Sequence, residues 1–336
     1  MKIIKNSLTL LIFIVNIFSG MSQPSEKEEF LSFGKPLLTL YSDFYAGISP
    51  GNSQSAFEVK RAYFGYEYYL SPEFTLTAKL DIGSPDDVSE YSLLRRYAYF
   101  KNACITYTKG KIKSSFGIID LLQFKYQEKY WDHRYVFKSF QDEYRFGSSA
   151  DLGWNIVYEI SDWILADMTI MNGEGYTQLQ NDYTYKGGWG TTLKPLKGLS
   201  LRIYYDLAAK DVKQSTMSLF LGYEYKTRFR IACEYNYKWN ENYMKEYDRY
   251  GYSVYGLWNI LPRLQIFGRY DMVKSNMLAG DDYPWNLARD GSTLIGGVQY
   301  SPLPKVRFAL NYQDWYPYAK NAENEAYIYL NLECSL

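Results

Sequence analysis

The chain has 336 residues, with 37 basic and 37 acidic side chains, so that its formal net charge is zero. This balance gives no support for nucleic acid as a partner, because nucleic-acid-binding domains carry an excess of basic residues. Aromatic residues make up 19% of the sequence, and 37 residues are tyrosine. Such numbers are typical of a membrane β-barrel, which carries aromatic girdles at both membrane interfaces.

The N-terminus has the pattern of a secretory signal peptide. Two lysines precede the apolar run Leu8–Phe18, and small residues follow it. This run is too short for a transmembrane helix, and no later stretch reaches the roughly 18 apolar residues that such a helix needs. We therefore predict a signal peptide over residues 1–22 and a short periplasmic segment over residues 23–35.

Most of the remaining chain alternates apolar with polar residues, which is the pattern of β-strands with two different faces. In residues 199–207 every second residue is apolar, whereas Arg202 and Asp206 belong to the other row. Segments of about ten residues suit strands that cross a bilayer at a tilt. A soluble β-sandwich also alternates, but its strands are usually shorter and would not carry charges along every polar face.

The sequence therefore predicts an all-β fold, a transmembrane antiparallel β-barrel of about sixteen strands within residues 36–336. The strands at 56–70 and 91–108 do not keep a clean alternation, so their limits are the least certain. The sixteen predicted strands cover residues 36–48, 56–70, 73–82, 91–108, 110–118, 147–160, 162–172, 184–195, 198–208, 215–226, 228–238, 249–260, 263–273, 292–301, 305–314 and 325–335.

The connections between these strands alternate in length. Short turns follow the even-numbered strands and longer loops follow the odd-numbered ones, as in bacterial outer-membrane barrels. This arrangement predicts that both termini lie on the periplasmic, short-turn side. The last strand also resembles the terminal strand that such barrels use for assembly. The predicted longer loops cover residues 49–55, 83–90, 119–146, 173–183, 209–214, 239–248, 274–291 and 315–324.

The third long loop, residues 121–147, differs from the rest because it does not alternate and is rich in aromatic and charged residues. A loop of this length is uncommon unless it is functional or disordered, and its aromatic content argues against disorder. We predict that it folds into the barrel and narrows the bore. The alternative is an ordinary surface loop.

Two sets of residues are candidates for the pore. Because both sets mix basic and acidic residues, we expect a general diffusion pore with a weak preference for either charge. Helical spacing would allow the four basic residues of the loop to lie near one face and form a local anion site. The predicted constriction residues are Lys125, Lys129, Arg134, Lys138, Glu128, Asp132, Tyr130 and Trp131. The predicted wall residues are Lys79, Asp81, Lys113, Arg202, Arg230 and Arg269.

The residue types that usually build catalytic and metal centres are scarce. Cys104, Cys233 and Cys334 are scattered through predicted strands, and the one histidine, His133, is next to Asp132 without a recognisable nucleophile motif. Metal sites and barrel hydrolases need histidine, cysteine or carboxylate groups at defined spacings. We therefore expect no cofactor, no metal and no enzymatic activity.

Several short motifs, in order, resemble the phosphate-selective porin O/P family of outer-membrane porins, in the form common in Bacteroidetes. The resemblance covers most of the mature chain and implies a sixteen-stranded porin, often a trimer, with an inward third loop. The family usually carries an arginine shortly before the Asp-x-Gly motif, where this sequence has Ser149 and Ala150. The matching motifs are Phe57-Glu58-Val59-Lys60-Arg61-Ala62, Leu80-Asp81, Phe116-Gly117, Asp151-Leu152-Gly153 and Met171-Asn172-Gly173-Glu174-Gly175.

The sequence as a whole predicts a porin of the outer membrane of a Gram-negative bacterium, which allows passive diffusion of small hydrophilic solutes or ions. The expected partners are outer-membrane lipid, small solutes or anions, and two further copies of the chain in a homotrimer. A non-conducting barrel that serves a larger outer-membrane complex is the main alternative, and a barrel enzyme is a more distant one.

Overall fold

The computed structural model describes residues 30–51, 53–83, 98–180 and 182–336. The chain divides into residues 1–32 and residues 33–336. The predicted signal peptide and residues 91–97 of the predicted fourth strand lie outside the described residues. None of the described helices is long and apolar enough to span a membrane.

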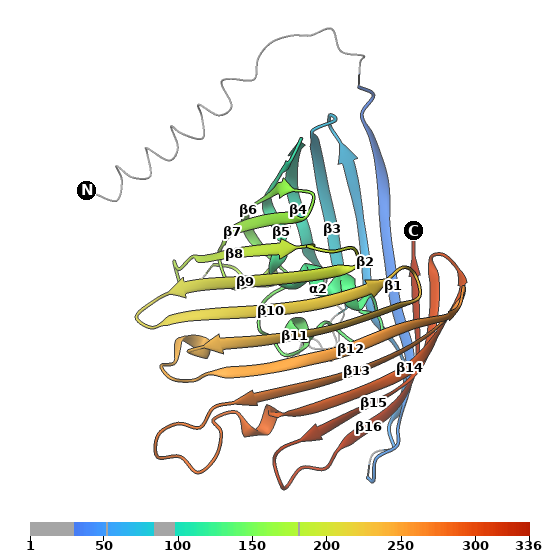
Figure 1. The fold of residues 1–336 in the computed structure, drawn as a ribbon, viewed down its shortest axis with the longest axis vertical. Coiled ribbons are helices and arrows are strands. Elements are labelled where there is room, and N and C mark those ends of the chain that lie inside the picture. Colours follow the sequence, from blue (N-terminus) through green and yellow to red (C-terminus); the bar gives the residue numbers. More distant parts are fainter. Residues whose placement is uncertain (1–29, 52, 84–97, 181) are drawn as a thin grey trace. The chain divides into compact units, whose positions relative to one another are not determined.

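Residues 33–336 form a closed antiparallel barrel of sixteen strands (Figure 1). Each strand pairs with its neighbours in sequence, and β1 pairs with β16 to close the sheet. The predicted fold class and strand number are therefore confirmed. The strands are β1 (Phe33–Gly47), β2 (Ser55–Tyr69), β3 (Phe74–Ile82), β4 (Ala98–Lys109), β5 (Ile112–Asp120), β6 (Ala150–Ser161), β7 (Ile164–Met171), β8 (Lys186–Leu193), β9 (Leu199–Ala209), β10 (Lys213–Tyr225), β11 (Phe229–Trp239), β12 (Arg249–Leu261), β13 (Leu264–Ser275), β14 (Gly291–Leu303), β15 (Val306–Pro317) and β16 (Glu325–Ser335).

Within the described residues, helical structure is found only in the connections between strands. The connection between β5 and β6, residues 121–149, contains the helices α2 (Leu122–Trp131) and α3 (Phe140–Glu143). Single turns, η1 (Glu241–Tyr243) and η2 (Leu287–Arg289), lie in two further connections at the same end of the barrel.

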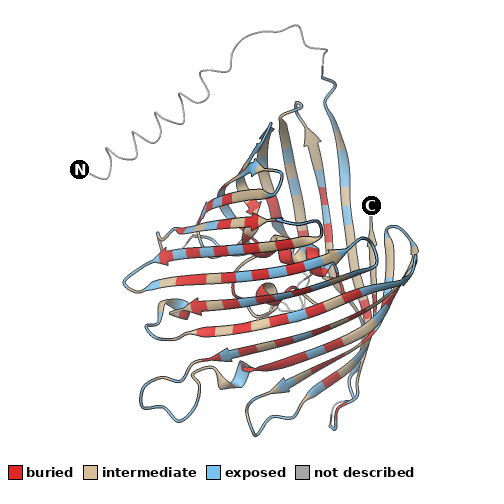
Figure 2. Ribbon diagram, in the orientation of Figure 1, coloured by how far each residue is buried: buried red, intermediate tan, exposed pale blue. Residues whose placement is uncertain are grey.

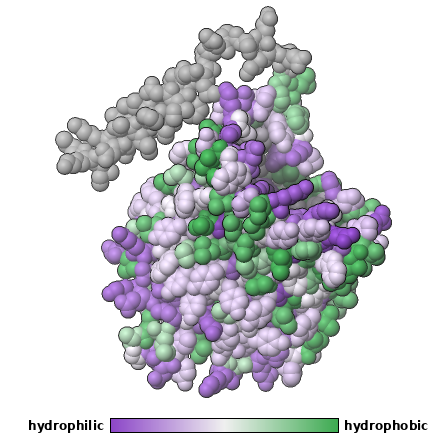
Figure 3. All heavy atoms as spheres, in the orientation of Figure 1, coloured by the Kyte–Doolittle hydropathy of each residue, from purple (hydrophilic) through white to green (hydrophobic). Residues whose placement is uncertain are grey.

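Burial alternates along the strands, as Figure 2 shows most clearly for β8 to β13. In β9 the polar residues Arg202 and Asp206 are buried, whereas Ile203 and Leu207 are exposed. A water-soluble sheet would bury the apolar row instead, because removal of apolar surface from water stabilises the fold. Hydrophobic residues also gather over the middle of the face seen in Figure 3. The inverted pattern is that of a barrel with an apolar exterior and a polar interior.

Connection lengths alternate between the two ends of the barrel. The turns after β4, β6, β12 and β14 are only two residues long, whereas the connections after β5 and β13 span residues 121–149 and 276–290. Several described strand limits differ from the predictions by up to three residues; β6, for example, begins at Ala150 and not at residue 147. The first strand begins at Phe33, before the predicted start at residue 36, and the β9–β10 connection is shorter than predicted, covering residues 210–212.

A β-bulge explains why the second strand does not alternate cleanly around Arg61, and β4 contains another bulge. Tyr41 pairs with Arg61 and Ser42 pairs with Val59, which leaves Lys60 as an extra residue of β2. A bulge of this kind bends the strand and redirects neighbouring side chains. Consecutive residues of β2 can therefore face the same space, which a period of two does not allow.

The bulge in β4 has the same effect. Lys79 pairs with Asn102 and Leu80 pairs with Phe100, so that Lys101 is the extra residue of β4. Lys101 and Asn102 are consecutive, yet both are buried. The irregular alternation in the sequence is thus a property of the folded strands and not a fault in their assignment.

Candidate functional site

The β5–β6 connection packs one face of its longer helix against the barrel wall. In α2 the buried residues Gln123, Phe124, Gln127, Tyr130 and Trp131 follow the three- and four-residue spacing of one helical face. The helix ends at Asp132, whose positive φ of 59° is the left-handed conformation that often terminates helices. The connection is therefore an ordered segment with a defined buried side.

Aromatic residues of this connection form a core with residues of six consecutive strands. Trp131 and Tyr135 are each 1% exposed, and Tyr130 is 7% exposed. Their rings lie against strand residues in edge-to-face arrangements, with centroids 5.2 Å apart for Trp131 and Tyr255. Aromatic pairs of this geometry add to the stabilisation from burial. The core comprises Tyr130, Trp131, Tyr135, Val136, Phe220, Ala232, Tyr255, Leu257, Phe267, Ile295 and Ala309.

Four arginines, one from each of β9, β11, β13 and β15, donate hydrogen bonds to main-chain carbonyls of the connection. Each guanidinium is also paired with a carboxylate, so that most of its donors are satisfied within the protein. The carbonyl contacts are Arg202 to Leu122, Arg230 to Tyr130 and Arg269 to Lys138, each 2.7 Å, and Arg307 to Asp132, 2.9 Å. The carboxylate partners, in the same order, are Asp167, Glu224, Asp271 and Glu333.

These contacts change the role expected for three predicted wall residues. Arg202, Arg230 and Arg269 were predicted to line the pore wall; all three contact the β5–β6 connection, and Arg230 also lines a cavity of about 640 Å³. A guanidinium that already holds a carbonyl and a carboxylate has little capacity left for a solute. We conclude that these arginines hold the connection in place.

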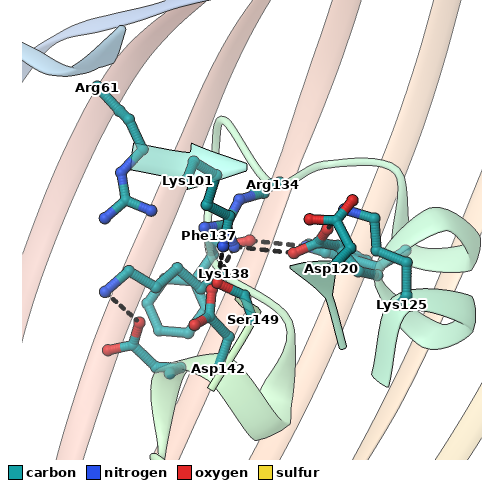
Figure 4. Close-up of polar contacts among 12 residues, drawn as sticks. Arg61, Lys101, Asp120, Lys125, Arg134, Phe137, Lys138, Asp142 and Ser149 are labelled. Carbon is teal, nitrogen blue, oxygen red and sulfur yellow. Dashed lines mark hydrogen bonds and ion pairs between the residues drawn. The ribbon is translucent and has the colours of Figure 1, made fainter. Parts of the chain in front are cut away.

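Charged residues of the connection pair mainly with one another (Figure 4). Arg134 forms ion pairs with Glu128, at 2.9 Å, and with Asp142. Lys125 pairs with Glu128 at 3.1 Å and with Asp120 at 3.6 Å. The predicted constriction residues Lys125, Glu128 and Arg134 therefore belong to one alternating network of charges.

The pKa values in this network show that the ion pairs outweigh the cost of burial. Burial alone would raise the pKa of Glu128, but Arg134 and Lys125 lower it below its usual value. Burial alone would also lower the pKa of Lys125, but Asp120 and Glu128 raise it above its usual value. The groups are therefore ionised together at neutral pH.

A cavity of about 290 Å³ lies between the connection and the wall formed by β1, β2, β15 and β16. Four of its lining side chains are basic and two are acidic, so that the lining has a basic excess. Lys60 and Arg61 reach it together because of the bulge in β2. The lining residues are Tyr41, Glu58, Lys60, Arg61, Arg134, Val136, Phe137, Lys138, Glu143, Gln313 and Tyr329.

The four basic residues of the connection do not form one cluster. Arg134 and Lys138 line this cavity, whereas Lys129 lines a second cavity of about 640 Å³ near the short β8–β9 turn. Lys125 lines neither of these two cavities. The local anion site that helical spacing would allow is therefore absent from the described connection.

The remaining constriction candidates serve as packing or pairing residues. Tyr130 and Trp131 are buried in the aromatic core, and the Trp131 indole donates to the carbonyl of Phe137 at 2.9 Å. Asp132 pairs with Arg307 at 3.2 Å. None of these three residues lines the 290 Å³ cavity.

The remaining wall candidates lie apart from one another. Asp81 pairs with Arg61 at 3.3 Å and accepts a hydrogen bond from Tyr176 at 2.7 Å. The Lys79 ammonium lies over the ring of Tyr63, 5.5 Å from its centroid. Lys113 is exposed and close to the β4–β5 turn. Of these, only Asp81 is linked directly to a residue of the cavity lining.

Arg61 and Lys101 were not among the candidates from sequence, although both lie close to the charged network in Figure 4. Lys101 is buried, contacts the hydroxyl of Ser149 and lies 4.2 Å from the ring centroid of Tyr176. For Arg61 the broken alternation of the second predicted strand was the available signal. Its meaning depends on the strand register, which the sequence does not display.

His133 is buried inside the aromatic core and not exposed in a catalytic arrangement. Its ring lies between Trp131, Tyr135 and Phe267, and its Nδ1 is 3.0 Å from the carbonyl of Trp131. Burial lowers the pKa of His133 to about 4, so that the ring is neutral at neutral pH. The neighbouring Asp132 carboxylate is paired with Arg307. This environment favours a packing role for the ring.

Comparison with solved structures supports the fold. An outer-membrane channel, DcaP of Acinetobacter baumannii, matches with a TM-score of 0.67 and 10% identity, over 94% of this chain and 100% of that one. OmpF of Salmonella typhi matches with a TM-score of 0.67 and 10% identity, over 90% and 97%. An anion-selective porin from Comamonas acidovorans matches with a TM-score of 0.66 and 8% identity, over 91% and 100%.

This chain has the barrel fold of those outer-membrane proteins. At such low identity the likeness concerns the fold alone. No protein-family model matches the sequence, and no curated protein matches it either. The particular porin family that the motifs resemble therefore stays a prediction.

Proposed function

We propose that the protein is an outer-membrane porin, in which small hydrophilic solutes diffuse between the β5–β6 connection and the wall of β1, β2 and β16. The cavity of about 290 Å³ is the observation that carries this proposal, because it lies between the connection and the strand wall and is lined by charged side chains of both. The apolar exposed rows of the strands support insertion into a membrane. A barrel of sixteen strands is also wide enough to hold water.

The connection sets the size limit in this account. Arginines on four strands hold its main chain, and the aromatic core fills the space between the connection and β10–β15. Solutes are thereby restricted to the other side of the lumen. The mixed charges of the cavity lining give a weak selectivity, since salt screens exposed charges beyond about 10 Å at 0.1 M.

The proposal is tested by conductance of the purified protein in planar bilayers. Deletion of Gln127–Gln141 removes most of the constriction and should increase single-channel conductance several-fold. A matched control shortens the outer β13–β14 connection within residues 276–290, which contacts neither cavity lining nor aromatic core. An unchanged conductance after the first deletion, with the barrel still folded, contradicts a constricting connection.

A non-conducting barrel is the second candidate, and the extent of the aromatic core favours it. Eleven buried residues join the connection to the strands, and a segment packed this well could close the lumen. Such a barrel would serve as a structural or assembly component of a larger outer-membrane complex. The absence of channels from the wild-type protein, together with their appearance after the Gln127–Gln141 deletion, would identify this case.

Location and assembly belong to the same proposal. Export by a signal peptide and insertion into the outer membrane predict a heat-modifiable protein that needs detergent for extraction. Recovery from the periplasm without detergent contradicts it. A homotrimer is proposed from the motif resemblance, and mass measurement in mild detergent distinguishes trimer from monomer while leaving the barrel proposal intact.

A further inference from the structure

The two ends of the barrel carry opposite charge. Acidic residues outnumber basic ones in the long connections 172–185, 240–248 and 276–290. The short turns instead contain mainly basic residues, with Glu73 and Asp162 as their acidic members. The basic residues of the short turns are Lys111, Lys194, Lys197, Lys226, Arg228, Arg263 and Lys305.

Basic and exposed apolar residues occur together in four of these turns. In the β8–β9 turn Leu196 is 69% exposed and precedes Lys197. In the β12–β13 turn Leu261 is 58% exposed and lies two residues before Arg263. A single apolar residue on a surface needs no explanation, but a repeated apolar and basic pair is a distinct pattern.

The other two turns repeat the pair. Leu303 is 61% exposed and lies two residues before Lys305, in the β14–β15 turn. In the β10–β11 turn Tyr225 and Phe229, 41% and 40% exposed, flank the basic residues. Because β8 to β15 follow one another around the sheet, the four turns are neighbours at one end of the barrel.

We call their basic residues the basic arc: Lys197, Lys226, Arg228, Arg263 and Lys305. All five are exposed. Within the described part of the chain, none of them forms an ion pair. Their charge is therefore available to a partner outside the chain.

We propose that the basic arc binds the headgroups of anionic phospholipids at the short-turn surface of the membrane. A phosphate or phosphoglycerol headgroup supplies the negative charge, and the acyl chains supply the surface on which the leucines and aromatic rings lie. Long basic side chains at a membrane boundary place their charge among headgroups while their stems stay in apolar surroundings. This inference rests on the proposed function, since it requires the barrel to be inserted in a bilayer.

A soluble anion is the competing ligand for part of the arc. Lys197 and Lys226 also line the 640 Å³ cavity, together with Lys129 of the β5–β6 connection. Arg228, Arg263 and Lys305 do not line that cavity. A variant of these three residues therefore tests lipid binding without altering the cavity.

The experiment compares spin-labelled phosphatidylglycerol with spin-labelled phosphatidylcholine around the full protein in bilayers of phosphatidylcholine. The wild type should associate with phosphatidylglycerol several-fold more strongly than with phosphatidylcholine. The triple variant Arg228→Gln, Arg263→Gln and Lys305→Gln should lose most of this preference, as should the wild type in 1 M salt.

The control changes an equal number of basic residues at the opposite end, Lys245→Gln, Arg289→Gln and Lys320→Gln. This variant should keep the lipid preference of the wild type. The proposal is overturned if the wild type and the triple variant prefer phosphatidylglycerol equally. It is also overturned if the triple substitution changes the ion permeability ratio and leaves the lipid preference unchanged. Failure of the wild type to enter bilayers contradicts the proposed function instead, and conductance recorded on the same samples distinguishes the two failures.

Discussion

The wall from β9 to β11 and the wall from β2 to β4 face the same β5–β6 connection, but they differ in the regularity of their strand pairing and in the contacts that they make. Strands β9, β10 and β11 pair without interruption, and they supply arginines and apolar residues that hold the connection. Strands β2 and β4 each contain a bulge, at Lys60 and Lys101. Regular pairing thus accompanies the packing against β9 to β11, and the bulge in β2 accompanies the charged cavity.

The difference shows that the environment decides what a basic residue does. Arg269 is buried, with a carboxylate 2.6 Å away and a main-chain carbonyl 2.7 Å away, so it acts as an anchor. Lys138 belongs to the same contact through its carbonyl, but its side chain lines the cavity. One of these side chains therefore stabilises the connection, and the other would face the solutes under the proposed function.

The largest expected effect is on the free energy of unfolding, and it distinguishes the anchoring residue from the residue that lines the cavity. The substitution Arg269→Met leaves Asp271 buried without its ion pair, which typically costs roughly 3–5 kcal/mol. Lys138→Met, on the cavity side, should cost less than about 1 kcal/mol, because exposed ion pairs contribute little. Urea unfolding of the heat-modifiable band in detergent measures both, and equal losses for the two variants contradict the assignment.

The next largest effect concerns the pH dependence of stability where the connection packs into the aromatic core. Because burial lowers the pKa of His133 from 6.5 to about 4, the folded protein binds this proton less readily than the unfolded chain. The stabilisation is fully present above pH 6.5 and is lost as the pH falls towards 4. Each pKa unit corresponds to about 1.36 kcal/mol, so a shift from 6.5 to about 4 makes the loss of stability roughly 3 kcal/mol at most.

This dependence is measured by hydrogen exchange of residues 131–137 at a series of pH values. Charged groups near the ring are Arg307, Asp132 and Arg230. Glu128 and Asp142 have lowered pKa values, so their own contribution is lost only at more acidic pH. The variant His133→Phe should show no slope in this window, and an unchanged slope in that variant assigns the effect to another group.

A smaller effect is expected from a single hydroxyl group. Tyr135 donates to Gln299 at 2.7 Å within the aromatic core, and Tyr135→Phe leaves that amide oxygen buried without its donor. The expected cost is about 1–2 kcal/mol. Tyr329 lines the cavity, where water can replace a lost contact, so Tyr329→Phe should cost less in the same unfolding assay. A larger cost for Tyr329→Phe than for Tyr135→Phe would indicate that water reaches the aromatic core.

The smallest effect is on selectivity. Lys60→Glu and Lys138→Glu reverse two charges of the cavity lining and should shift the permeability ratio towards cations by roughly two-fold in 0.1 M salt. Reversal potentials in a KCl gradient measure this ratio. Lys320→Glu, in the outer β15–β16 connection, is the control and should leave the ratio unchanged. Strong anion selectivity of the wild type, with block by millimolar phosphate, contradicts the weakly selective pore.

The sequence predicted the barrel well because a period of two is a local property. Residues 199–207 reveal their two faces without any knowledge of their neighbours, and the turn lengths then give the topology. The site depends on contacts between distant residues. The partners of Arg202 and Arg269, at Leu122 and Lys138, lie far away in sequence, so their anchoring role could not be predicted.

The β-bulges show the same limit of prediction from sequence, because they too depend on how distant residues pair. The broken alternation around Arg61 was visible in sequence, but only the pairing registers show that Lys60 and Lys101 are the extra residues of two bulges. His133 illustrates the opposite case. Its position next to Asp132 was the one feature on which an enzymatic alternative rested, and the fold places the ring against aromatic residues and pairs the carboxylate with Arg307.

The two faces of α3 provide the most direct test of the central claim that solutes pass on one side of the connection. Glu143 lines the cavity, whereas Gln141, two residues earlier, is fully buried and receives a hydrogen bond from Gln123. Each is replaced by cysteine in a chain whose three native cysteines are serine. A negatively charged methanethiosulfonate reagent is then added during single-channel recording.

The account predicts that the Glu143→Cys channel reacts and that its conductance falls in a step, while the Gln141→Cys channel keeps its conductance. Reaction at Gln141→Cys with none at Glu143→Cys would place the water path on the packed side and contradict the account.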